Sequence, residues 1–182
     1  MHASATPYVA HLTVKKENQT QEVFTLTGCL GLTGISTNSF GVFINNLRSR
    51  ELNIGLAWPA LVRKLLDSKS ISEAETTLHN NMPSAGRNFL LCDNAEASNF
   101  EVTAKQIARE GDLSRGYIFH TNHYVTKLKE TEELTTRSQT TLNRYKYLSE
   151  KIPELAKENL NVQLIGEKLL NTSLGIISLE AP

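Results

Sequence analysis

The sequence predicts an α+β protein built on antiparallel strands. Short β-branched segments joined by polar turns occupy the first quarter of the chain and return after residue 83, and two amphipathic helices separate these groups. Hairpins grouped apart from helices indicate an antiparallel sheet, whereas strands alternating with helices would indicate βαβ units. We therefore expect one domain over residues 1–182, with helices packed on a sheet.

The composition excludes several classes of protein. With 182 residues, 40% of them hydrophobic, the chain can bury a core without disulfides or metals. Its 19 basic and 19 acidic residues give a net charge of zero, which argues against nucleic-acid and membrane partners. A zero net charge also leaves little repulsion between copies, so self-association is compatible with the composition. Two cysteines are too few for a disulfide scaffold or a four-thiolate zinc site, and no secretory signal is visible. We expect a cytoplasmic protein without a cofactor.

The first part of the chain predicts strands. Alternating β-branched residues separated by a polar turn are typical of a hairpin. Three glycines within a short stretch indicate a sharp bend, because tight turns and close backbone approach need Gly. In chain order we expect strands at residues 9–14 and 21–27, a bend from Gly28 to Gly34, and a strand at residues 42–44 that ends at Asn45 and Asn46.

Two short helices are expected next. Leu61, Leu65 and Leu66 share one helical face, and Pro59 suits the first turn of that helix. Ser70, with Glu73 three residues later, is an N-cap signature that begins a second helix. The short connection between them favours a helical hairpin packed on the sheet.

The last part predicts strands followed by helices. Apolar runs bounded by polar turns indicate the strands, and an apolar face at Leu142, Tyr145 and Leu148 indicates a helix. Pro153 is expected to begin a further helical region. In chain order we expect strands at residues 88–92, 99–103, 105–110 and 117–119, helices at residues 140–151 and 153–170, and a last strand at Ile176 and Ile177.

The segment His120-Thr121-Asn122-His123 follows one of these strands. Two imidazoles at i and i+3 on a helix can share a metal ion. Here they follow a strand, and no carboxylate or thiol lies at the usual local spacing. We therefore expect a loop fixed by Asn and His hydrogen bonds, without a metal.

Cys29 and Cys92 are the candidates for a nucleophilic thiol, which needs a base in contact with it. Cys92 lies in an apolar strand, where packing is the favoured role, and a pairing with His120 or His123 would make a thiol peptidase. Cys29 follows Gly28 in the bend, where a small residue in a crowded strand is favoured. Asn45 and Asn46, at a strand end, either donate a carboxamide N–H to an oxyanion or serve ordinary turn chemistry.

Five segments occur in a specific order: GLTGISTNSFGVFINN at residues 31–46, GLAWPALVR at 55–63, AGRNFLLCD at 85–93, HTNHY at 120–124, and Ser138 followed by Arg144-Tyr145. Together, over about residues 8–150, they resemble the penicillin acyltransferase family. Its members are acyl-coenzyme A:isopenicillin-N acyltransferase-like proteins of the N-terminal-nucleophile hydrolase superfamily.

The resemblance implies a four-layer αββα sandwich. It also implies an N-terminal cysteine, freed by autocatalytic cleavage after a glycine, that attacks amide or thioester acyl groups. Asn45 resembles the oxyanion-hole asparagine of related bile-salt and penicillin V hydrolases, and Arg144 resembles an arginine near their nucleophile. His120, Asn122 and His123 match the family's signature loop, where the resemblance implies a structural role first.

In that family the nucleophile lies upstream of the glycine-rich segment, so we expect this chain to be an incomplete domain that is inactive alone. Gly28-Cys29 matches the chemistry of autocleavage and makes Cys29 the alternative nucleophile. The expected function is an acyltransferase or amidohydrolase-like domain for a small acyl-amine or acyl thioester such as acyl-coenzyme A. A second polypeptide or homo-oligomer is expected to complete the sheet. The alternative is a non-catalytic binding module that retains the acyl-amine pocket.

Overall fold

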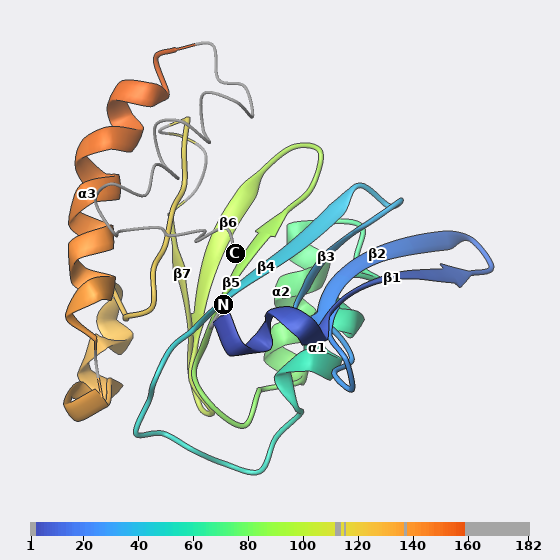
Figure 1. Ribbon diagram of the computed structural model, residues 1–182, viewed down its shortest axis with the longest axis horizontal. Coiled ribbons are helices and arrows are strands. Elements are labelled where there is room, and N and C mark those ends of the chain that lie inside the picture. The colour runs from blue at the N-terminus through green and yellow to red at the C-terminus, as the bar shows by residue number, and fades with distance from the viewer. Residues whose placement is uncertain (1–2, 112–113, 115, 137, 159–182) are drawn as a thin grey trace.

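A single antiparallel sheet forms the centre of the computed structural model, which describes residues 3–111, 114, 116–136 and 138–158 (Figure 1). Seven strands pair in chain order, so each strand lies beside its neighbours in the sequence. The strands are β1 (Val9–Lys16), β2 (Gln19–Leu26), β3 (Thr33–Ser36), β4 (Phe40–Asn46), β5 (Arg87–Cys92), β6 (Ala97–Val102) and β7 (Ile107–Glu110). The predicted α+β class is confirmed. The described residues hold this one sheet, where an αββα sandwich has two.

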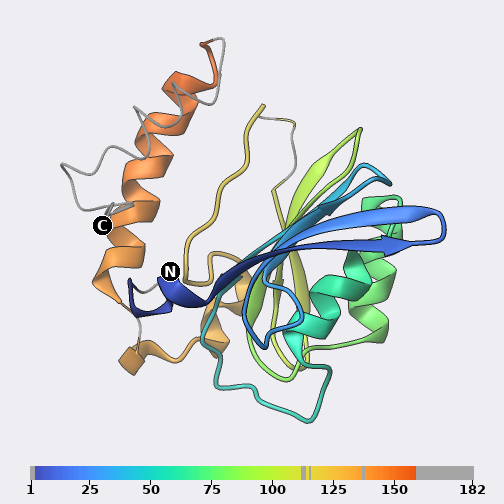
Figure 2. The same ribbon diagram turned by 45° about the vertical axis from the view of Figure 1, so that its right-hand side comes forward.

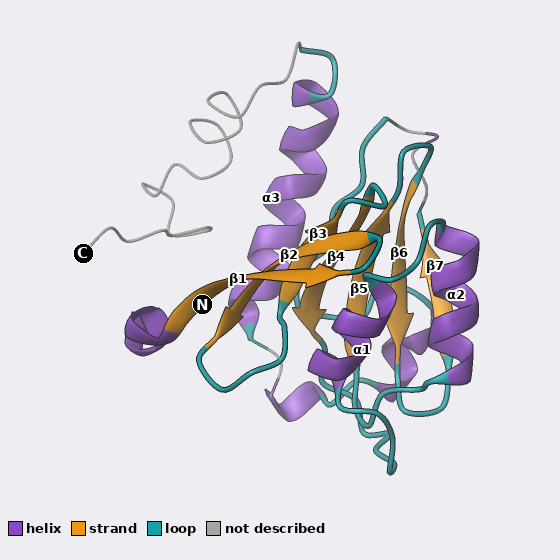
Figure 3. Cartoon of the chain, turned by 90° about the vertical axis from the view of Figure 1, so that its right-hand side faces the viewer, coloured by secondary structure: helices purple, strands orange, loops and turns teal. Residues whose placement is uncertain are grey.

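Helices lie on both sides of the sheet (Figure 3). Helices α1 (Trp58–Leu65) and α2 (Ile71–Asn80) cover one face, and α3 (Gln139–Leu155) lies on the opposite side. Short 3-10 helices occupy Ala3–Tyr8, Lys127–Thr131 and Leu134–Thr136. The main core lies between the sheet and the α1–α2 pair, and its fully buried members include Val23, Val42, Leu61, Leu65, Ile71, Leu78, Phe89 and Phe100.

The predicted N-cap of α2 is present. The Ser70 hydroxyl accepts a hydrogen bond from the backbone N–H of Glu73 at 3.2 Å. The Glu73 carboxylate accepts one from the backbone N–H of Lys69 at 2.9 Å. Asp93, in the β5–β6 turn, accepts the N–H of Ile71 at 3.0 Å, so this helix start is tied to the sheet as well as capped.

The sheet face opposite α1 and α2 changes character from one end to the other. Phe24, Ile35 and Phe43 leave 42%, 54% and 41% of their surface exposed there. At the β5–β6 end, Asn88, Asn99 and Glu101 are fully buried. The segment after β7 runs between the sheet and α3 and lies over these polar residues (Figure 2).

Three sequence expectations were wrong. Residues 33–36 form β3, because Gly34 packs against the Glu22 carbonyl and Leu66, so the glycine serves close strand approach instead of a bend. Residues 117–119 are irregular, and the Phe119 ring packs on Tyr145 of α3 at 5.1 Å. Pro153 lies inside the last turn of α3 and does not begin a new helix. The helix expected to reach residue 170 and the strand at Ile176 and Ile177 lie outside the described residues.

None of the helices in the described part of the chain combines the length and the apolar character that crossing a membrane requires.

Candidate functional site

A hollow of about 230 Å³ lies where the end of β4 meets the start of α3. Its walls come from four segments that are far apart in the sequence: the exit of β4, the signature loop, the connection before α3, and α3 itself. The lining residues are Asn46, Arg48, Asn122, Glu132, Glu133, Ser138, Thr141 and Arg144. Four residues from the segments singled out in the sequence, Asn46, Asn122, Ser138 and Arg144, therefore meet at one place.

Asn122 links the two sides of this hollow. Its side-chain oxygen accepts a hydrogen bond from Arg144 Nη2 at 2.8 Å. Its side-chain nitrogen donates to the backbone carbonyl of Asn46 at 3.2 Å. The Asn46 side chain in turn accepts from Arg87 Nη1 at 2.6 Å. Asn122 thus joins α3 to the end of β4, although 76 residues separate it from Asn46.

Thr141 of α3 fixes the backbone that carries Asn122. The Thr141 hydroxyl accepts the N–H of Asn122 at 2.7 Å and lies 3.1 Å from His123 Nδ1. Thr121 Oγ1 donates to the Thr141 carbonyl at 3.1 Å. Thr141 exposes 1% of its surface, so these contacts are shielded from competing water.

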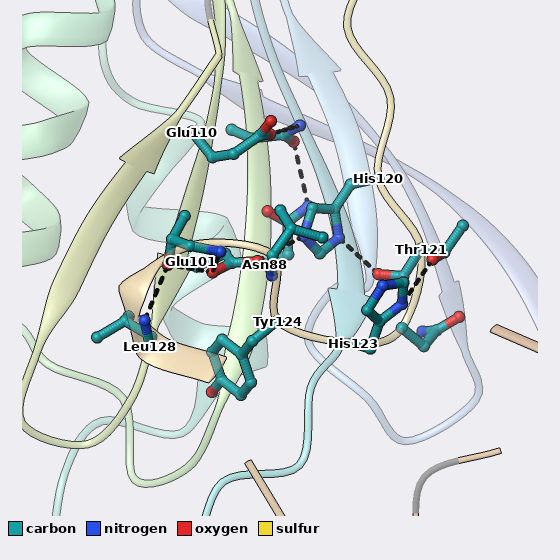
Figure 4. Close-up of polar contacts among 12 residues, drawn as sticks. Asn88, Glu101, Glu110, His120, Thr121, His123, Tyr124 and Leu128 are labelled. Atoms are coloured by element: carbon teal, nitrogen blue, oxygen red, sulfur yellow. Dashed lines mark hydrogen bonds and ion pairs between the residues drawn. The ribbon is translucent and has the colours of Figure 1, made fainter. Parts of the chain in front are cut away.

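Glu101 of β6 fixes the same segment from the sheet side (Figure 4). His120 Nε2 lies 2.8 Å from Glu101 Oε1, and the N–H groups of Val125 and Thr126 donate to this carboxylate at 2.6 and 3.0 Å. The Thr126 hydroxyl also contacts it. Burial opposes ionisation of Glu101, but the hydrogen bonds from His120, Thr126 and the backbone hold its pKa below the ordinary range.

Both ring nitrogens of His120 are held by neighbours. Nδ1 lies 2.5 Å from the Thr121 carbonyl oxygen, and Nε2 lies 2.8 Å from the Glu101 carboxylate. The side chains of His120 and Glu101 expose 1% and 0% of their surface, so their contact closes the signature loop onto β6 in a buried place.

The remaining wall of the hollow is built by backbone pairing. The N–H of Glu133 donates to the Arg48 carbonyl at 3.0 Å, and the N–H of Arg50 donates to the Thr131 carbonyl at 2.8 Å. Ser49 and Glu132 form an isolated antiparallel bridge. These bonds hold Glu132 and Glu133 beside Arg48, so the hollow carries charges of both signs.

Arg144 is the cation placed nearest to Asn122. Burial lowers its pKa, but a guanidinium stays charged at any physiological pH. Its hydrogen bond to Asn122 uses one of five N–H donors, which leaves donors in the planar arrangement that suits a carboxylate.

Asn45 lies next to this hollow but does not line it. The lining residue from β4 is Asn46. Asn45 pairs directly with Asn88 of β5, on the sheet face opposite α1 and α2. Its role as an oxyanion donor stays a prediction.

The thiol–imidazole pair that a thiol peptidase needs is absent from the described residues. Cys92 contacts the backbone of Gly41, and burial raises the pKa of its thiol. His120 and His123 are instead engaged by Glu101, Thr121 and Thr141. Cys29 follows Gly28, whose φ of +83° forms the tight bend after β2. Within the described part of the chain no hydrogen bond joins Cys29 to Asn45, Asn122 or Arg144.

Sequence reasoning missed several residues that build the site. Glu101, Thr141 and Arg48 were not singled out for the site, and Asn46 was considered only beside Asn45 at the end of a strand. A glutamate inside a strand of otherwise uncharged residues is a usable signal, because a buried carboxylate needs several donors. Thr141 gave no such signal, since threonine in the first turn of a helix is common.

Comparisons with known proteins bear on the family. A profile of the family described as acyl-coenzyme A:6-aminopenicillanic acid acyl-transferase matches residues 8–172. Among solved structures, penicillin V acylase from Agrobacterium tumefaciens is similar, with 14% sequence identity and a TM-score of 0.49. The similarity covers 75% of this chain and 42% of that chain, so this chain spans less than half of the acylase. A comparison with curated proteins gave no match.

The family match spans the sheet, the signature loop and α3, and so includes every residue that lines the hollow. By this match the chain belongs to the acyl-coenzyme A:6-aminopenicillanic acid acyl-transferase family.

Proposed function

We propose that this chain forms the substrate-binding part of an acyltransferase or amidohydrolase that acts on a small acyl-amine or acyl thioester. The observation that carries the proposal is the 2.8 Å contact between Arg144 and Asn122 at the hollow beside β4. It joins an arginine and a signature asparagine that the family resemblance selected independently. In this proposal Arg144 binds the carboxylate of the acyl acceptor, and Asn45 stabilises the oxyanion of the attacked carbonyl.

The chain alone is proposed to bind without turnover. Acyl transfer in this family needs a nucleophilic thiol, and neither thiol is among the residues that line the hollow. The raised pKa of Cys92 also keeps that thiol protonated at neutral pH. The position and protonation of these thiols support the alternative of a non-catalytic binding module. The two proposals differ only in whether another polypeptide segment supplies a nucleophilic thiol to the hollow.

Thermal unfolding in the presence of ligand tests the proposed binding. The probes are 6-aminopenicillanic acid, named in the family description, and penicillin V, named for the solved relative. Binding to the folded state should raise the melting temperature with ligand concentration. Arg144→Lys should abolish most of this rise. Arg50→Lys is the matched control, because Arg50 is exposed and its guanidinium donates to the Glu130 carbonyl outside the hollow. An equal rise in both variants would contradict the proposal.

Turnover is measured separately, as amine release from penicillin V and thiol release from an acyl-coenzyme A. We expect neither from the purified chain. Turnover that disappears in Cys29→Ala, together with an intact mass for a chain beginning at residue 29, would instead establish Cys29 as the nucleophile.

We infer further that the apolar face of the sheet packs against a second copy of the chain. Phe24, Ile35 and Phe43 are each more than 40% exposed on this one face, and large contiguous apolar patches are unusual on monomers. The zero net charge leaves no overall repulsion between copies. Sedimentation should detect a dimer that Ile35→Lys disrupts, and a monomeric wild-type chain would contradict this inference.

A further inference from the structure

A row of hydrogen-bonded side chains crosses three strands on the sheet face opposite α1 and α2. Asn88 in β5 and Asn99 in β6 are fully buried, and Glu110 in β7 is partly buried. Asn99 Nδ2 donates to Glu110 Oε2 at 3.1 Å. Asn88 Nδ2 donates to Asn99 Oδ1 at 3.2 Å. The row therefore runs from a carboxylate at one edge of the sheet toward its middle.

Two acceptors set the direction of the bonds in the row. A carboxylate oxygen and a carbonyl oxygen both accept, so Asn99 turns its amide nitrogen to Glu110 and to the Phe119 carbonyl, at 3.1 and 3.3 Å, and its oxygen to Asn88. Asn88 then donates to that oxygen and is left with its own Oδ1 at the end of the row. This atom is buried and has no hydrogen-bond partner among the described residues. A buried acceptor in this state is destabilising unless a donor reaches it.

Asn45 is the residue directly across from that end. The β4–β5 register pairs Asn45 with Asn88, so both side chains leave the same face, with Cβ atoms about 4.5–5.5 Å apart. The carboxamide of Asn45 has no hydrogen bond within the described part of the chain, and the residue is only partly buried. Its nitrogen carries two N–H groups, so it can serve two acceptors at once.

We propose that Asn88, Asn99 and Glu110 are positioning residues for Asn45. In this proposal the Asn45 side chain turns so that one N–H is donated to Asn88 Oδ1, which has no partner among the described residues, and this bond aims the other N–H at the carbonyl oxygen of a bound acyl group. The negative charge of Glu110 polarises the row, because hydrogen bonds in series strengthen one another. The contact between the second N–H of Asn45 and an acyl carbonyl rests on the proposed function. The proposed Asn45–Asn88 bond does not depend on that function.

Nuclear magnetic resonance of the side-chain carboxamide signals tests the row in the full chain. Glu110→Gln removes the charge while keeping the size of the side chain. We expect the signals of Asn99, Asn88 and Asn45 to shift, in that decreasing order. Glu96→Gln is the matched control. It removes the same charge from the β5–β6 turn, where Glu96 binds Arg109 at 2.8 Å, and it should leave the Asn45 signals in place. A shift at Asn99 without one at Asn45 would overturn the proposal.

The nuclear magnetic resonance readout involves no substrate, so a failure here is distinct from a failure to bind or turn over acyl groups.

Discussion

Glu101 Oε1 and His120 Nε2 lie 2.8 Å apart, and neither side chain exposes more than 1% of its surface. One residue of β6 thereby holds the loop that carries Asn122 to the hollow. The bond links the stability of the sheet to the geometry of the candidate site, and the first two predictions follow from it.

Glu101→Gln should lower the free energy of unfolding by about 3 kcal/mol, because it removes the buried carboxylate that contacts His120 and accepts the N–H groups of Val125 and Thr126. Urea denaturation monitored by circular dichroism measures the change. Glu96→Gln removes a charge from an exposed pair with Arg109 and should cost less than about 1 kcal/mol. Similar losses in the two variants would mean that the buried pair contributes nothing beyond an exposed one.

The same carboxylate predicts a loss of stability in acid. Burial disfavours the charged form of Glu101, yet its hydrogen bonds keep the folded-state pKa below the ordinary range, which is about 4.3 in an unfolded chain. The folded state therefore binds this proton less readily than the unfolded state does. The contribution is full above about pH 5 and is lost as the pH falls through 4.3 toward the lower folded-state pKa. Urea midpoints between pH 7 and pH 3 should fall less steeply in Glu101→Gln than in the wild type. Parallel curves would contradict the assignment.

Thr141→Val should destabilise the chain by about 1–3 kcal/mol, because it removes the buried hydroxyl that accepts the N–H of Asn122. It should also reduce the rise in melting temperature with 6-aminopenicillanic acid, since the position of Asn122 depends on that bond. Thr140→Val is the matched control, with the same change at the neighbouring exposed position. Loss of ligand response in both variants would show that Thr141 has no special part in it.

Cys92 should be slow to alkylate at neutral pH, because burial raises the pKa of its thiol. In Cys29→Ala, where Cys92 is the remaining thiol, the rate with iodoacetamide should still be rising with pH near pH 9, as the thiolate fraction does. Mass spectrometry gives the rate. An alkylation rate that reaches a plateau below pH 8 would mean that the thiol has a lowered pKa. Cys92 would then again be a candidate nucleophile.

Ser70→Ala should cost about 1 kcal/mol, the usual loss on removing an N-cap hydroxyl. Thermal denaturation is sufficient to detect it. Ser72 lies two residues further into α2 at an exposed position. Ser72→Ala should therefore change the free energy of unfolding by less than roughly 0.5 kcal/mol. A larger effect at Ser72 than at Ser70 would contradict the capping assignment.

Local sequence signals predicted most of the sheet and helices. The β1–β2 hairpin, the cap at Ser70 and the β5–β6 hairpin depend on residues close together in the chain, so their patterns are readable there. β3 was missed because Gly34 reads as a turn until its packing against β2 is known. The irregular course of residues 117–119 is set by Tyr145 of α3, a contact that no local pattern carries.

The candidate site was predicted in its parts and not in its assembly. Asn122 and Arg144 were selected by resemblance, but nothing in the sequence indicated that they touch. Their contact depends on Glu101 and Thr141, which hold the signature loop from β6 and α3. Such long-range anchors have no periodic signature, because each is a single polar residue matched to a distant partner.

The strand order has a consequence for how the chain acquires its structure. Every strand pairs with its neighbour in the sequence, so most of the sheet requires only short loops to close, and low contact order favours rapid folding. The exception is the β4–β5 pairing, which must wait for residues 47–86 to fold back through α1 and α2. During synthesis the first four strands can therefore assemble as they emerge, and α1 and α2 then cover their buried face. The candidate site, which needs α3, is the last part of the described structure to form.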